Sequence, residues 1–264
     1  AKDILLAEVE KLKKGEFDES LIEATVNNYK RYMQSLMESN SSRADQFVDA
    51  FINGIEWKDK VASLDKMSKV TKQQIVDFAN ANFKDNYAVV YKREGKDPNE
   101  KKMSKPAITP IFMNRDTSSA FLREIQASQV KPIEPVFLDY AKDMGQTTAK
   151  SGIPVLYKQN TTNDLFTIMY VFDMGTSQDK VLGTAVQYLD YLGTSKMTPE
   201  QIKQEFYKLA CDYFVSPGTE RVFVGISGLS ENMGKAMELF ESLLADAQPA
   251  PEVLENMKAD ILKS

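Results

Sequence analysis

The sequence predicts an α+β fold, in which antiparallel strands pair locally and helices pack on them. Residues 165–172 are rich in β-branched and aromatic side chains at successive positions, as expected of a strand covered on both sides. Residues 211–215 and 221–227 flank the turn signal Ser-Pro-Gly-Thr at 216–219, which predicts a hairpin. Stretches with apolar residues at helical spacing precede and separate these strands.

Composition narrows the classes of function. The 264 residues contain no histidine and one cysteine, Cys211, so neither a disulfide framework nor a Cys-His nucleophile is available. The formal net charge of −5 is spread along the chain, which argues against nucleic acid as a partner. No apolar run reaches bilayer length, so we expect no membrane span. The compartment stays open between the bacterial cytoplasm and the periplasm.

Residues 1–95 predict helices followed by one strand. The first helix covers 1–14 and ends at Gly15, and Asp18 caps a long second helix. Further helices are expected near 43–53, 57–64 and 70–83, and NYAVVYK at 86–92 is the expected strand. A single closing strand makes this an incomplete domain, and a chain that starts inside a helix is expected to be part of a longer protein.

Residues 96–150 have a different composition. Prolines at 106, 110, 132 and 135 interrupt regular helices, although 118–127 can form a short one. The stretch also carries many apolar side chains, too many for a solvated tether. We therefore expect a connector that packs along both flanking pieces.

Residues 151–264 predict a second α+β piece. A strand at 153–158 is expected to return through the turn at 159–163 as a hairpin with the strand at 165–172. The helix at 179–192 has apolar residues on more than one face, so it is expected to be the most buried helix of this piece. Thr198, Pro199 and Gln201 mark the start of the next helix, and helices at 230–244 and after Pro251 follow the second hairpin.

The order of elements in 163–206 resembles the core of a domain in the pitrilysin/insulinase family of zinc metallopeptidases. Family members carry an inverted His-x-x-Glu-His motif on the helix after the strand, followed by Gly-Thr. Gly183, Gly193 and Thr194 look like the flanking residues. Two alignments of the motif are open, one anchored on Gly183 and one on Gly193. In the family the three motif positions hold a zinc ligand, the catalytic base and a second zinc ligand. The alignment on Gly183 places Val186, Leu189 and Asp190 there, and the alignment on Gly193 places Thr184, Gln187 and Tyr188 there.

Neither triplet can hold a zinc ion and activate its water, so the resemblance is to a non-catalytic domain of the family. Residues 1–95 resemble the end of such a domain, through Val70-Thr71, Phe78-Ala79, Phe83, residues 89–93 and Gly95. The implied layout is the C-terminal half of one pitrilysin-like domain at 1–95, a packed connector at 96–150, and the N-terminal half of a following, inactive domain at 151–264.

The resemblance implies that the parent protein is a zinc-dependent peptidase whose zinc lies in a catalytic half. This segment would hold neither catalytic residues nor metal ligands, and it would form part of the wall of a peptide-binding chamber. Extended peptide would bind by β-addition along Arg221, Val222, Phe223 and Val224. The expected partners are the catalytic half, extended peptides, and a second copy through exposed half-domain edges. The alternatives are a non-peptidase assembly subunit with the same fold and an unrelated helical interaction module.

Overall fold

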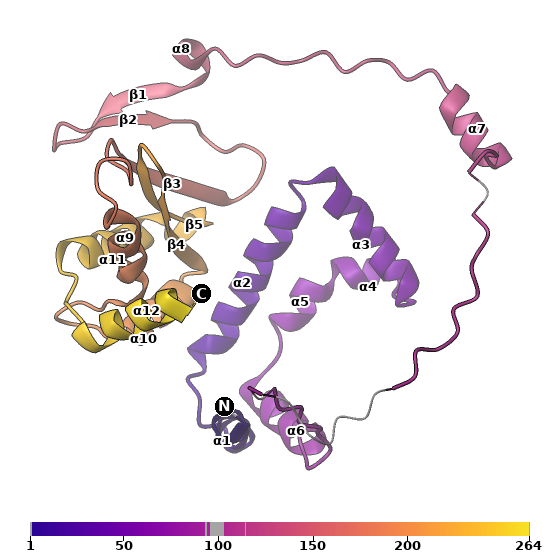
Figure 1. Ribbon diagram of the computed structural model, residues 1–264, viewed down its shortest axis with the longest axis horizontal. Helices are drawn as coiled ribbons and strands as arrows, with labels where there is room; N and C mark the ends of the chain where they lie inside the picture. Colours follow the sequence, from indigo (N-terminus) through magenta and orange to yellow (C-terminus); the bar gives the residue numbers. More distant parts are fainter. Residues whose placement is uncertain (1, 93, 96–102, 114, 264) are drawn as a thin grey trace. The chain divides into compact units, whose positions relative to one another are not determined.

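The computed structural model describes residues 2–92, 94–95, 103–113 and 115–263 (Figure 1). The chain forms two compact units, Ala1–Asn86 with Gln159–Ser264, and Tyr87–Lys158. Arg93 and residues 96–102, on which parts of the expected domain ending and connector fall, lie outside the described residues.

A three-stranded antiparallel sheet organises the first unit. Its strands are β3 (Leu165–Phe172), β4 (Cys211–Pro217) and β5 (Val222–Leu229), in the order β3-β5-β4. Ile226 of β5 lies opposite both Ile168 and Tyr213, so these side chains share one face of the sheet. The predicted hairpin of residues 211–227 and the α+β fold class are confirmed.

The hydrophobic core lies between this face of the sheet and the helices α9 (Leu182–Tyr188), α10 (Pro199–Lys208) and α11 (Met233–Ala245). Helix α11 contributes Ala236, Phe240 and Leu243, which recur at helical spacing and are fully buried. The remaining buried members of the cluster are Ile202, Phe206, Cys211, Val222, Val224 and Ile226. The short helix η1 (Leu189–Tyr191) follows α9, η2 (Ser230–Asn232) precedes α11, and α12 (Pro251–Lys263) follows α11.

The expected cap at Asp18 is wrong, because the second helix begins at Ser20 after Glu19, whose side chain makes no capping bond. The helix start predicted at Thr198 is confirmed. The Thr198 side chain accepts the Gln201 N–H while the Gln201 side chain accepts the Thr198 N–H, and Pro199 occupies the first turn. Thr71 and Gln74 form the same capping box at the start of α6 (Lys72–Asn82). Because such signals lie within four residues of one another, they can be recognised in the sequence alone.

The first unit also contains a layer of helices from residues 2–86. Besides α6, they are α1 (Lys2–Lys14), α2 (Ser20–Leu36), α3 (Asn40–Ile52), α4 (Trp57–Val61) and α5 (Ser63–Met67). Helix α2 joins this layer to the sheet and α10. Asn28 Nδ2 donates to the Tyr207 carbonyl at 2.7 Å, and Arg31 pairs with Asp212 at 2.5 Å.

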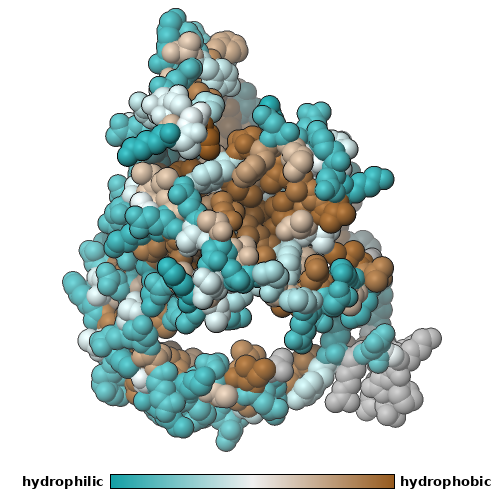
Figure 2. All heavy atoms as spheres, turned by 90° about the vertical axis from the view of Figure 1, so that its left-hand side faces the viewer, coloured by the Kyte–Doolittle hydropathy of each residue, from teal (hydrophilic) through white to brown (hydrophobic). Residues whose placement is uncertain are grey.

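Two expectations about burial in the first unit are wrong. Strand β3 is covered on one face only, since Met169 and Val171 on the other face are 51% and 50% exposed. Helix α9 and η1 contain no fully buried residue, whereas α11 contains three, so the helix at 179–192 is not the most buried. Apolar side chains also gather in a continuous area on one face of the molecule (Figure 2).

The second unit contains α7 (Ala120–Ala127), α8 (Tyr140–Asp143), β1 (Gly145–Thr148) and β2 (Pro154–Tyr157). Strand β2 pairs with β1 and not with β3, so the expected hairpin of 153–172 is wrong. The β1–β2 turn closes tightly because Gly152 adopts φ 86°, which favours glycine, and its N–H donates to the Ala149 carbonyl.

The strand expected at 86–92 is not formed, since these residues are not in a strand. Apolar side chains of the connector stay accessible, with Phe112 91% and Ile133 95% exposed, in contrast to the expected packing. The short helix expected at 118–127 is present as α7. No helix in the described parts of the chain is long and apolar enough to cross a membrane.

Candidate functional site

The residues that the first alignment places at the zinc-motif positions lie beside the hydrophobic core. Val186 of α9 and Leu189 of η1 are half-buried and pack against the cluster beneath the sheet. Asp190 is also half-buried and accepts a hydrogen bond from the Tyr213 hydroxyl. Burial raises the pKa of Asp190, although Lys203 and this hydrogen bond act in the opposite direction. Burial and the neighbouring Asp190 raise the pKa of Tyr213 to about 12.

Gly193 and Thr194, which follow the motif positions, make backbone hydrogen bonds that fix the neighbouring loops. The Gly193 carbonyl accepts the Gln248 N–H at 2.9 Å, and the Thr194 N–H donates to the Met197 carbonyl at 2.9 Å. Gly183 lies inside α9, where a Cβ would make ordinary contact with Thr176. In the second alignment, Tyr188 accepts the backbone N–H of Ala250 through its hydroxyl.

Neither motif alignment therefore places three metal-ligating side chains around one point. The first has two aliphatic side chains in the core, and in the second Thr184 is half-buried while Gln187 is exposed. In the described ranges, no group of three or more Asp, Glu or Cys residues could hold a metal ion.

The strand expected to add peptide, Arg221–Val224, has both edges occupied. Val222 and Val224 pair with β3 at Phe172 and Tyr170 and with β4 at Pro217 and Val215. Strand β5 is thus the central strand of the sheet, and its backbone groups already bond on both sides. The prediction that peptide adds to this strand is therefore wrong. Arg221 pairs with Asp173 at 2.9 Å, and Phe223 is half-buried opposite Val171.

The outer edge of β3 is open instead. The Asp164 carbonyl accepts the Ser230 N–H at 2.8 Å, which fixes the phase of the ladder. In an antiparallel pair every second residue bonds to the neighbouring strand, so the backbone groups of Thr167, Met169 and Val171 point away from β5. These residues are exposed, and the described residues supply no backbone partner for them on this side.

The loop before β3 covers the first residue of that edge, Leu165, through the side chains of two asparagines. Asn160 Nδ2 donates to the Leu165 carbonyl at 2.8 Å, and the Leu165 N–H donates to Asn163 Oδ1 at 3.1 Å. The accessible edge therefore begins at Thr167. The outer edge of β4 differs, because Tyr213 and Val215 are half-buried against the core and Pro217 lacks an N–H.

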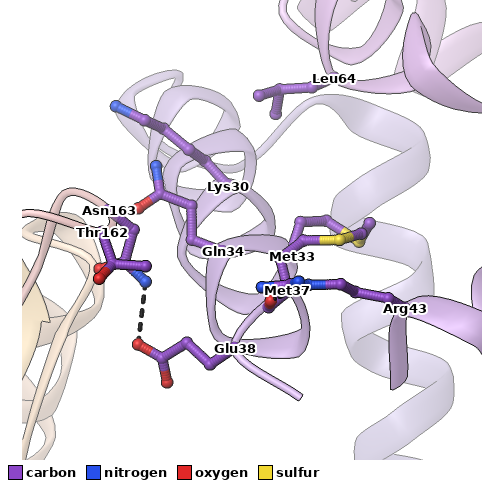
Figure 3. A pocket seen from close by; sticks show the side chains of 9 residues that line it. All are labelled: Lys30, Met33, Gln34, Met37, Glu38, Arg43, Leu64, Thr162 and Asn163. Atoms are coloured by element: carbon purple, nitrogen blue, oxygen red, sulfur yellow. Dashed lines mark hydrogen bonds between the residues drawn. The ribbon is translucent and has the colours of Figure 1, made fainter. Parts of the chain in front are cut away.

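This loop is held by Gln34, in the last turn of α2, and by Glu38, just after the end of that helix. The Asp164 N–H donates to Gln34 Oε1 at 3.1 Å, and Asn163 Nδ2 donates to Glu38 Oε1 at 2.9 Å (Figure 3). Sequence reasoning assigned 159–163 only to a turn and missed the roles of the Gln34, Glu38 and Asn163 side chains. The two asparagines within the five residues before an apolar strand were the signal, because Asn side chains readily bond nearby backbone.

A cavity of about 470 Å³ opens beside the loop. Met33, Met37 and Leu64 give it an apolar lining, and Lys30 and Arg43 bring positive charge to it (Figure 3). The rest of the lining consists of Gln34, Glu38, Thr162 and Asn163. The loop connects the two features, because Asn163 lines the cavity and also accepts a hydrogen bond from the first residue of β3.

Comparison with known proteins gives weak similarities to peptidases. No protein-family model and no curated protein matches the chain. A peptidase M16 inactive domain from Pseudomonas fluorescens is 20% identical, with TM-score 0.42, over 46% of this chain and 31% of that chain. The periplasmic protease PqqL from Escherichia coli is 13% identical, with TM-score 0.42, over 98% and 32%.

The ferredoxin protease FusC, solved in complex with Arabidopsis ferredoxin, is 9% identical, with TM-score 0.41, over 95% of this chain and 31% of that chain. The chain thus spans about a third of the length of the solved structures it resembles. These values do not place it in a family, and the α+β fold rests on its own sheet and helices.

Proposed function

We propose that the chain is a non-catalytic segment of a zinc-dependent peptidase of the pitrilysin/insulinase type, and that it forms part of the wall of a peptide-binding chamber. The zinc would belong to a catalytic half supplied elsewhere in the parent protein. The role of this segment is to bind extended peptide by adding it as a strand to the open edge of β3.

The observation that carries this proposal is the accessible edge at Thr167, Met169 and Val171. Exposed strand edges are templates for pairing with another chain, and proteins usually cover or charge them. Here the edge carries an apolar side chain at Met169 and another at Val171. Backbone pairing gives affinity for many peptide sequences, which suits a chamber that receives unfolded peptides.

The test uses a proline that blocks only the outer edge. The Met169 N–H points away from β5, so Met169→Pro removes an edge donor while the β3–β5 ladder stays intact. We expect an unstructured fluorescein-labelled peptide of about eight residues to bind the chain, and Met169→Pro to weaken binding at least about tenfold. Fluorescence anisotropy titration measures both affinities.

Met169→Thr is the matched control, because it removes the apolar side chain and keeps the N–H. It should retain most of the peptide binding, and both variants should keep the far-ultraviolet circular dichroism spectrum of the unmodified chain. Absence of peptide binding to the unmodified chain, or equal binding by Met169→Pro, would show that the β3 edge is not the binding site.

A scaffold role in a larger assembly is a second candidate, favoured by the apolar surface of α3 and α4. Phe51 and Ile52 are 87% and 74% exposed, and Val61 of α4 is 66% exposed. Exposed apolar surface of this kind indicates contact with another protein. This candidate predicts association with a folded partner that Met169→Pro leaves unchanged.

A further inference from the structure

We propose that the cavity beside α2 captures the C-terminal residue of the peptide that adds to β3. The α-carboxylate would lie near Lys30 and Arg43, and the last side chain, an apolar one, would lie on Met33, Met37 and Leu64. This inference rests on the proposed function. It goes further by making the site selective for a free chain end.

The direction of strand addition places the C-terminus at the cavity. Every strand pair in the sheet is antiparallel, and antiparallel addition is the commoner arrangement in general. A peptide antiparallel to β3 runs from Val171 towards Thr167, so its C-terminal end reaches the loop at Asn160 and Asn163. That loop stops the edge at Leu165, and Asn163 lines the cavity beyond it.

The charges at the cavity favour a carboxylate over an ammonium group. The Lys30 ammonium is 3.7 Å from the Glu231 carboxylate, which is longer than a hydrogen bond, so its donors can turn to a ligand. Arg43 is held at the cavity by Nε donating to the Met37 carbonyl at 2.5 Å and Nη1 donating to Asn40 Oδ1 at 3.3 Å. Glu38, the carboxylate of the lining, already accepts from Asn163.

A peptide added in the parallel direction would bring its N-terminal ammonium to these two cations, which is unfavourable. The apolar lining provides the second element of recognition. Two of its three members are methionines, whose unbranched side chains adapt to differently shaped apolar groups. The site therefore fits a terminal aliphatic or aromatic residue without requiring one particular residue.

The experiment compares two peptides that differ only at the end of the chain. One ends in leucine with a free carboxylate, and the other is the same sequence with a C-terminal amide, both labelled with fluorescein at the N-terminus. We expect the amide to bind the chain about tenfold more weakly. In Lys30→Gln the affinity for the peptide with the free carboxylate should fall to that for the amide, so that the two peptides bind alike.

Lys58→Gln is the control, because Lys58 is an exposed lysine of α4 outside the cavity lining. It should leave the preference for the acid unchanged. Thermal melting of each variant shows whether the fold is kept, and Lys30→Gln is preferred to an Arg43 variant because Arg43 bonds the end of α2.

Equal binding of acid and amide, together with loss of binding in Met169→Pro, would overturn this inference and leave the proposed function standing. A preference for the acid that persists in Lys30→Gln would also overturn it. Failure of both peptides to bind would contradict the proposed function itself.

Discussion

Replacing Phe240 with alanine is expected to lower the free energy of unfolding by about 3–5 kcal/mol. Phe240 is fully buried, and its ring lies 5.9 Å from that of Tyr170 and 5.7 Å from that of Tyr213. It therefore joins α11 to two strands of the sheet at once. Truncation removes this apolar contact and leaves a cavity that the surrounding strands can only partly fill.

Urea unfolding followed by far-ultraviolet circular dichroism measures this loss. Phe51→Ala is the matched control, because Phe51 is 87% exposed near the end of α3 and its truncation should change stability by less than about 0.5 kcal/mol. If the two substitutions cost the same, the core does not lie between α11 and the sheet.

Gly225→Ala is the second substitution with a large expected effect, a loss of about 1–3 kcal/mol. Gly225 lies in the central strand between Met169 of β3 and Phe214 of β4. A Cβ there would come within 2.3 Å of the Ile168 carbonyl oxygen and 2.6 Å of the Phe214 ring. The backbone oxygen belongs to a paired strand, so the sheet itself would have to shift.

Gly234→Ala provides the contrast within the same unit. Nothing lies within 4 Å of a Cβ at this position near the start of α11. Alanine has a higher helix propensity than glycine, so this variant should gain up to about 1 kcal/mol. Opposite signs for the two glycines in thermal or urea unfolding are the predicted result, and an unchanged stability in Gly225→Ala would argue against the strand order.

Local signals in the sequence predicted local structure well. The residues Thr198, Pro199 and Gln201 marked a helix start, and the turn at 216–219 marked the β4–β5 hairpin. Each of these features depends on residues a few positions apart. The capping side chains and the turn residues therefore act in the sequence much as they do in the fold.

Pairings between distant segments were not predictable in the same way. Strand β3 pairs with β5, more than fifty residues later, whereas the sequence favoured its neighbour β2. The partner of β2 is Gly145–Thr148, a short polar strand without the apolar alternation that identifies strands. For the same reason the sequence placed the open edge on β5, because strand order decides which edge of the sheet remains unpaired.

The burial of each helix depended on where it packs in the fold more than on how apolar its sequence is. Residues 179–192 are as apolar as a core helix, yet the segment ends in the short turn η1 and only its inner side contacts the core. Helix α11 lies over the centre of the sheet and buries more. The contacts of Gln34 and Glu38 with the loop before β3 join residues 130 and 125 positions apart, and no periodicity indicates such a pairing.

Amide hydrogen exchange along β3, measured residue by residue with and without bound peptide, tests the central claim most directly. The amides of Ile168 and Tyr170 bond to β5 and should exchange slowly in both states. Those of Thr167, Met169 and Val171 point outward, so they should exchange quickly in the free chain and slow by about tenfold or more with saturating peptide. Unchanged exchange at these three residues, with protection appearing elsewhere in the sheet, would contradict strand addition at β3.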